Sequence, residues 1–142
     1  MPAKKKSCLI VVDGMGGGLG VQLVSKLRDA FLDSVEIIAL GTNAVATERM
    51  VKAGASRGAA GENAIVQSVS LGDLILGPIG IIIGNSMLGE ITCAMANAIL
   101  SAHGERILLP LQNVHFTLAG IEGLPLSKMI ERAVEIAREK LG

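Results

Sequence analysis

The chain has 142 residues and a formal net charge of zero, and it is 50% hydrophobic but only 1% aromatic. A chain of this length fits one domain and buries a core without disulfides or metals, so we expect a single domain over residues 1–142. Basic residues cluster only at positions 4–6, and Trp and Tyr are absent. This composition excludes the basic and base-stacking surfaces that bind nucleic acids.

Cys8 and Cys93 stand in apolar segments without metal-ligand spacing. They predict buried free thiols, no metal site and a reducing, cytoplasmic compartment. The most apolar stretch, residues 74–88, is broken by glycine and proline and falls short of the ~20 residues of a membrane span, so no membrane partner is expected. Because only 18% of residues are charged, we expect a homo-oligomer that hides an aliphatic face.

Strand and helix patterns alternate along the chain. Aliphatic runs predict strands at 7–13, 35–40, 73–77, 106–111 and 115–119, the last two as a candidate antiparallel pair. Helical periodicity predicts helices at 21–31, 44–53, 62–69, 86–102 and 126–141. Residues 79–83 either extend a strand or turn into a helix. The alternation predicts a three-layer, doubly wound α/β fold with a mostly parallel sheet.

The segment DGMGGGLG, residues 13–20, directly follows the first predicted strand. Glycines at such a turn allow a tight reversal and a close approach of the backbone to a phosphate at a helix N-terminus. The spacing of Gly14, Gly16 and Gly20 is one residue longer than the dinucleotide fingerprint, and no P-loop Lys-Ser/Thr pair follows. A purely structural turn is the alternative. Because each glycine costs ~0.5 to 1 kcal/mol of backbone entropy, five of them in seven residues favour a ligand. Gly14, Gly16, Gly17 and Gly18 are expected to hold its phosphate. Asp13 is expected to belong to the same cofactor-binding site, where it would repel a phosphate unless it binds Mg²⁺, a ribose hydroxyl or an N–H group of the turn.

Ligands of open α/β sheets lie outside the carboxyl ends of the strands. The second strand is followed by Thr42 and Asn43 rather than by the acid that holds the ribose of NAD. This disfavours plain NAD and leaves open a 2′-phosphate on Thr42, Asn43 and Arg49, or a mononucleotide. Asn43 is alternatively the N-cap of the next helix. Gly77 and Gly80 either expose backbone to the ligand or simply end a strand.

Three carboxylates are candidates for acid–base chemistry at these strand ends: Asp13, Glu62 and Glu90. Asp13 alternatively makes local hydrogen bonds in the turn, and the two glutamates alternatively stabilise helix starts. His103, before Gly104, is interpreted as a partner of a helix C-terminal dipole, and His115 has no visible partner. Neither histidine looks catalytic, and no catalytic triad or metal-ligand set can be assembled. The catalytic residues and the cofactor therefore stay unassigned.

Five segments together resemble a family of small bacterial proteins known only as a domain of unknown function, namely residues 12–20, 39–43, 61–65, 77–81 and 89–92. The resemblance covers nearly the whole chain and implies a stand-alone Rossmann-like domain, without an activity. In size and opening turn the chain is also similar to single-domain CoA-binding proteins and nucleotide-sensing regulatory domains, which is a fold-level analogy.

These observations favour a nucleotide- or cofactor-phosphate-binding module. One alternative is a small enzyme, a reductase or a phosphate-handling one, that uses Asp13 or Glu90 as acid or base. The other is a structural or partner-binding protein without a small ligand, whose uncharged helix at 86–102 is the interaction surface.

Overall fold

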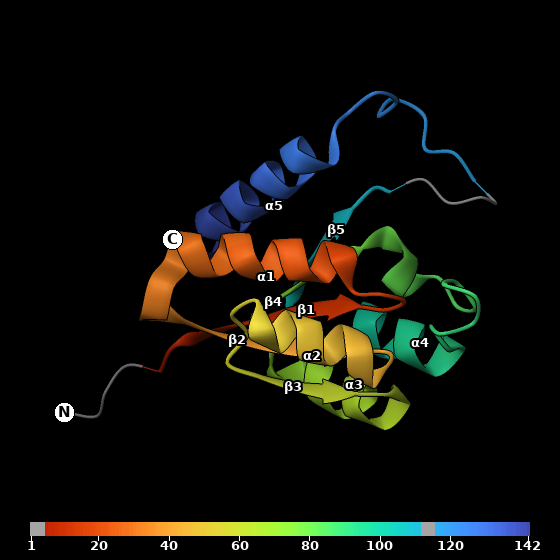
Figure 1. Cartoon of the computed structure of the whole chain (residues 1–142), viewed down its shortest axis with the longest axis horizontal. Helices are drawn as coiled ribbons and strands as arrows, with labels where there is room; N and C mark the ends of the chain where they lie inside the picture. The colour runs from red at the N-terminus through yellow and green to blue at the C-terminus, as the bar shows by residue number, and fades with distance from the viewer. Residues whose placement is uncertain (1–4, 112–115) are drawn as a thin grey trace.

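A five-stranded parallel sheet forms the centre of the molecule in the computed structural model, which describes residues 5–111 and 116–142 (Figure 1). The strand order is β3-β2-β1-β4-β5, and every pairing is parallel. The predicted α/β class with a mostly parallel sheet is therefore confirmed. The strands are β1 Ser7–Asp13, β2 Val35–Gly41, β3 Arg57–Ala60, β4 Leu74–Pro78 and β5 Glu105–Leu109.

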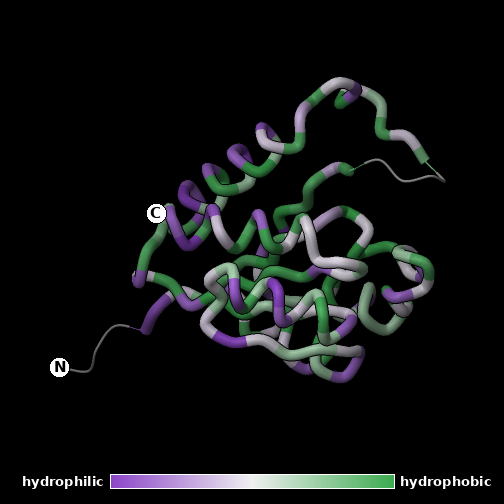
Figure 2. The backbone as a smooth tube through the Cα atoms, in the orientation of Figure 1, coloured by the Kyte–Doolittle hydropathy of each residue, from purple (hydrophilic) through white to green (hydrophobic). Residues whose placement is uncertain are grey.

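Helices cover both faces of the sheet because side chains alternate along each strand. Leu9 and Val11 of β1 point to the face covered by α1, α2 and α5, whereas Ile10 and Val12 point to the face covered by α3 and α4. The hydropathy-coloured backbone shows the central strands as predominantly apolar and α5 as amphipathic (Figure 2). The helices are α1 Gly18–Phe31, α2 Ala44–Lys52, α3 Glu62–Ser68, α4 Cys93–Ser101 and α5 Leu126–Leu141.

The segment between β4 and α4 differs from its prediction. Residues 79–83 neither extend β4 nor form an α-helix but make the 3-10 turn η3, Ile79–Ile82. The helix predicted over 86–102 begins only at Cys93, where the Thr92 side chain accepts a hydrogen bond from the Met95 N–H. Before it, Met87 and Leu88 have left-handed φ angles of 56° and 55°, which interrupt a helix. Residues 86–92 are therefore a loop.

The two strand errors have different causes. β3 was not predicted because its sequence, Arg-Gly-Ala-Ala, lacks an aliphatic run and is mostly exposed at the sheet edge. The strand predicted at 115–119 is wrong within the described residues. Phe116 forms a single isolated β-bridge, and residues 117–119 are not in a strand. His115 lies outside the described residues. β5 stops at Leu109, before Pro110, which has no N–H to donate to a ladder.

The two cysteines differ in their burial. Cys8 is buried in β1, and burial raises the pKa of its thiol to about 11. Cys93 is exposed, against expectation, because the buried side of α4 carries Met95, Ala96 and Ile99 instead. Within the described ranges, no helix is long and apolar enough to cross a membrane.

Candidate functional site

The glycine-rich turn lies where the direction of strand succession reverses. From β1 the chain proceeds to β2 on one side, and later returns to pair β4 with the other side of β1. In open α/β sheets the ligand crevice forms at such a switch point, outside the carboxyl ends of the strands. The turn at residues 14–17 leaves β1 at this end and leads directly into α1.

Asp13 fixes the two ends of the turn. It is only 5% exposed, and its Oδ1 and Oδ2 accept the N–H groups of Gly14 and Gly20 at 2.8 and 2.7 Å. Burial raises the pKa of Asp13, against the two backbone hydrogen bonds, which lower it. The local hydrogen-bond interpretation of Asp13 is confirmed. Both oxygens are engaged in holding the turn.

Several backbone donors of the turn are unused. Met15 donates to Glu90 and Gly17 donates to the Gly14 carbonyl, but within the described part of the chain no acceptor bonds the N–H groups of Gly16, Gly18 and Leu19. These groups lie at the N-terminal end of a 14-residue helix, where the helix dipole favours an anion.

The glycines of the turn divide into two kinds. A Cβ on Gly14 would lie 2.6 Å from Thr42 Oγ1, and Gly17 has a left-handed φ of 74° with the Ala46 Cα 2.9 Å from a Cβ position. Packing therefore requires these two glycines. Gly16 and Gly18 are exposed, have no left-handed φ, and a Cβ would meet only Arg49 at 3.5 Å for Gly16 and nothing within 4 Å for Gly18. Neither packing nor backbone conformation explains why these two positions are glycine.

Asn43 connects the end of β2 to the turn. Its Oδ1 accepts the Ala46 N–H at 2.8 Å, which confirms the N-cap interpretation. Its Nδ2 donates to the Met15 carbonyl at 2.9 Å, so the cap also holds the turn. Arg49 of α2 adds a hydrogen bond to the Gly16 carbonyl.

Glu90 reaches the same place from the loop before α4. Its Oε1 accepts the Met15 N–H and Asn43 Nδ2, both at 2.9 Å, and the Thr42 hydroxyl. The Thr42 hydroxyl and the Met15 N–H lower the pKa of Glu90. Its expected place at a helix start is wrong, because α4 begins only at Cys93. Glu62 does lie in the first turn of α3, and it is exposed.

The lowered pKa of Glu90 predicts a pH effect. A carboxyl with a lowered folded-state pKa contributes stability above its ordinary value of 4.5, and this contribution is lost as pH falls through the lowered value. In urea unfolding, the stability difference between wild type and Glu90→Gln should be present at pH 7 and should decline below about pH 4.5. A pH-independent difference for Glu90→Gln would contradict the prediction.

Gly77 and Gly80, at the end of β4, lie in different surroundings. Gly77 is buried, and a Cβ there would collide with the Val12 backbone of β1, so strand packing requires a glycine. Gly80 is half-buried, with Ser86 and Met87 at ordinary van der Waals distance from a Cβ position. Of the two, only Gly80 has room beside it.

The contact of Glu90 with the turn could not be found from local patterns. Met15 and Glu90 are 75 residues apart, and no spacing rule connects them. The sequence held only an indirect indication. Glu90 follows Gly89, which interrupts the predicted helix, and this segment comes after β4, the strand that pairs with β1.

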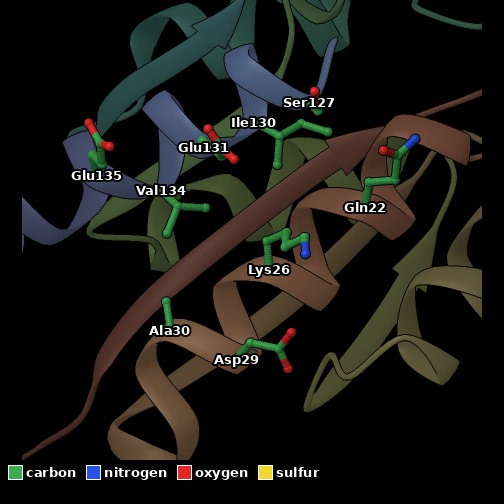
Figure 3. Close-up of a pocket in the computed structure, with 9 residues that line it drawn as sticks. All are labelled: Gln22, Lys26, Asp29, Ala30, Ser127, Ile130, Glu131, Val134 and Glu135. Carbon is green, nitrogen blue, oxygen red and sulfur yellow. The ribbon is translucent and has the colours of Figure 1, made fainter. Parts of the chain in front are cut away.

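A separate groove of about 480 Å³ lies between α1 and α5, away from the turn. Side chains from the two helices line it from opposite sides, with charges of both signs at Lys26, Asp29, Glu131 and Glu135 (Figure 3). None of the predicted site residues belongs to it. Among the residues that the structure describes, no group of three or more His, Cys, Asp or Glu side chains could hold a metal ion.

Comparison with known proteins supports the fold and supplies a family. The chain is similar to a dodecameric FMN-dependent UbiX-like decarboxylase from Escherichia coli O157:H7, at 16% identity and a TM-score of 0.52, over 96% of this chain and 94% of that one. This likeness concerns the fold alone. No curated protein matches the chain. The model of a domain of unknown function, DUF3842, matches residues 8–142, and the chain therefore belongs to this uncharacterised family.

Proposed function

We propose that this protein is a binding module for a nucleotide or another phosphate-bearing cofactor, and that the phosphate binds at the glycine-rich turn. The proposal rests on the surroundings of Gly16 and Gly18. Both are glycine without a packing reason, both are exposed, and their N–H groups have no acceptor among the described residues. A phosphate at this helix N-terminus would use the donors and would need the space.

Two further observations support a cofactor. The turn lies at the switch point of the sheet, the place where ligands bind in this architecture. The solved structure of similar fold belongs to an FMN-dependent protein, so a fold of this kind is compatible with the use of a phosphorylated cofactor. At 16% sequence identity, the likeness gives no information about the chemistry of this chain.

An enzyme that uses Asp13 receives little support from the geometry, because both oxygens of Asp13 bind the turn backbone. Glu90 is the remaining acid–base candidate of the site. Three hydrogen-bond donors hold its carboxylate, which suits a binding role.

Thermal unfolding in the presence of candidate ligands tests the proposal. The panel is NAD(H), NADP(H), ATP, GTP, CoA, S-adenosylmethionine and FMN. A ligand at about a hundred times its dissociation constant adds ~2.7 kcal/mol of stability, which moves the midpoint by several degrees. No shift with any of them, in protein shown to be folded and ligand-free, would favour the partner-binding alternative.

We also propose a homo-oligomer, with the exposed face of α4 in the interface. Cys93, Asn97 and Leu100 recur at helical spacing on this face, and Leu100 is 48% exposed. α4 carries no charged residue, and large uncharged surfaces commonly mark interfaces. The dodecameric assembly of the structural neighbour is consistent with this.

Introducing a charge tests the interface. Leu100→Glu should shift the sedimenting species from oligomer to monomer, because an unpaired carboxylate would be buried in the contact. Leu124→Glu, at a residue that is also exposed but lies outside α4, is the matched control and should leave the assembly intact. An unchanged oligomer in Leu100→Glu would place the interface elsewhere.

A further inference from the structure

We propose that the ligand is a ribonucleotide whose free ribose diol binds the Glu90 carboxylate, and that the site selects against a 2′-phosphate. The inference rests on the proposed function and narrows its ligand class. In dinucleotide-binding folds, an acid at the end of the second strand accepts the ribose hydroxyls. Here β2 is followed by Thr42 and Asn43, and the Glu90 carboxylate accepts hydrogen bonds from both side chains. A carboxylate therefore occupies the end of β2 although the local sequence has none there.

Only one oxygen of Glu90 is used within the protein. Oε1 accepts all three hydrogen bonds, and Oε2 has no partner among the described residues. In that part of the chain no buried side-chain oxygen lacks a partner, so Oε2 is open to solvent. The three donors fix the orientation of the carboxylate, and the lowered pKa keeps it ionised at neutral pH. An oriented, ionised and accessible oxygen is suited to accept the hydroxyls of a vicinal diol.

Exposed apolar side chains occur either near Glu90 in the sequence or in segments that contact it. Met15 is 45% exposed and belongs to the turn, and its N–H donates to Glu90. Val45 is 63% exposed and lies two residues after Asn43, and Leu88 is 92% exposed and lies two residues before Glu90. Each stands in one of the three segments that Glu90 joins. An apolar surface of this kind suits the faces of a purine or pyrimidine base, which completes a nucleotide together with the ribose and phosphate positions.

A 2′-phosphate would find an unfavourable environment at the same place. The phosphate would bring a second negative charge next to Glu90, and like charges at short range repel. Two of the groups that could compensate are engaged, because Thr42 and Asn43 donate to Glu90, whereas Arg49 uses only Nη1, which donates to the Gly16 carbonyl. The 2′-phosphate site that the sequence left open on these three residues is therefore disfavoured by the charge of Glu90 and by the contacts of Thr42 and Asn43.

Calorimetric titration with NAD and NADP tests the inference, because the two probes differ only in the 2′-phosphate. Wild-type protein should bind NAD more tightly than NADP. Glu90→Gln keeps the shape of the side chain but loses its charge and replaces one acceptor oxygen by a donor. It should weaken NAD binding by about tenfold to a hundredfold, the size of a hydrogen bond to a charged group, and should abolish the preference over NADP. Glu62→Gln, an exposed carboxylate at the start of α3, should change neither affinity.

The possible failures separate the two proposals. If wild type binds FMN or CoA, which have no free ribose diol, but none of NAD, NADP, ATP and GTP, the ribose inference is wrong and the proposed function stands. If Glu90→Gln binds both probes more tightly, Glu90 competes with the ligand instead of binding it, and the inference is again overturned. Unchanged affinities in Glu90→Gln overturn it as well. If wild type binds none of the nucleotides or phosphorylated cofactors of the panel, both proposals fail.

Discussion

Gly18→Val should abolish ligand-induced stabilisation while leaving the stability of the free protein within about 0.5 kcal/mol of wild type. Gly18 has no left-handed φ, and no atom lies within 4 Å of a Cβ placed there, so the fold accommodates a side chain. The same side chain would occupy the space in front of the unused N–H groups. The expected loss is the whole ligand-dependent gain, ~2.7 kcal/mol at a hundredfold excess over the dissociation constant.

Gly17→Val is the matched comparison, one residue away and with the opposite expected result. A valine at Gly17 would adopt a left-handed φ of 74° and place Cβ 2.9 Å from the Ala46 Cα. The left-handed conformation alone costs roughly 1 to 2 kcal/mol, so the midpoint of the free protein should fall by several degrees. Thermal unfolding with and without ligand measures both variants. A full ligand shift in Gly18→Val would mean that the phosphate does not bind at the turn.

Asp13→Ala is expected to cause a large loss of stability, with or without ligand. The substitution removes both acceptors of the Gly14 and Gly20 N–H groups in a position that is 5% exposed. Leaving a buried donor unsatisfied costs about 1 to 3 kcal/mol each, a substantial part of the ~5 to 15 kcal/mol that holds a typical domain. Asp13→Asn retains one acceptor and removes the cost of a buried charge, so its loss should be smaller.

Urea unfolding at pH 7 gives the required comparison, with the stability order wild type, Asp13→Asn, Asp13→Ala. Asp29→Asn, an exposed aspartate of α1, should match wild type. Equal stability of Asp13→Ala and wild type would show that Asp13 does not hold the turn. A normally folded and ligand-binding Asp13→Asn that loses a measured turnover would instead restore Asp13 as a catalytic candidate.

The sequence was sufficient for the parts of the fold that are set by local patterns. The strand at residues 7–13 and the amphipathic helix at 126–141 follow from hydrophobic periodicity, and both appear with those bounds. β3 escaped prediction because only tertiary pairing with β2 makes Arg57–Ala60 a strand. The start of α4 was misplaced because the residues at 86–92, uncharged except for Glu90, continue the helical pattern, while the backbone there has a left-handed φ at Met87, Leu88 and Gly89.

The candidate site was predictable to the same extent. The glycine-rich turn and the Asn43 N-cap of α2 are each encoded in a short local segment, so their type and position could be predicted. Glu90 was noted as an acid, but its partner set depends on a fold that brings residues 75 positions apart into contact. The distinction between packed and open glycines is likewise a property of the neighbours, since the sequence shows Gly17 and Gly18 as equivalent.

The pairing of β1 with β4 also determines when the sheet can be completed during synthesis. β1 is the central strand and precedes the other four in this chain, so it can pair with β2 on one side once α1 and β2 have been made. Its other edge stays open until β4 emerges, and the Cys8 N–H then bonds to Asp73, 65 residues later. Glu90 follows later still. During synthesis the glycine-rich turn is therefore made long before Glu90, and the proposed site can be complete only after β4 has been added to the sheet.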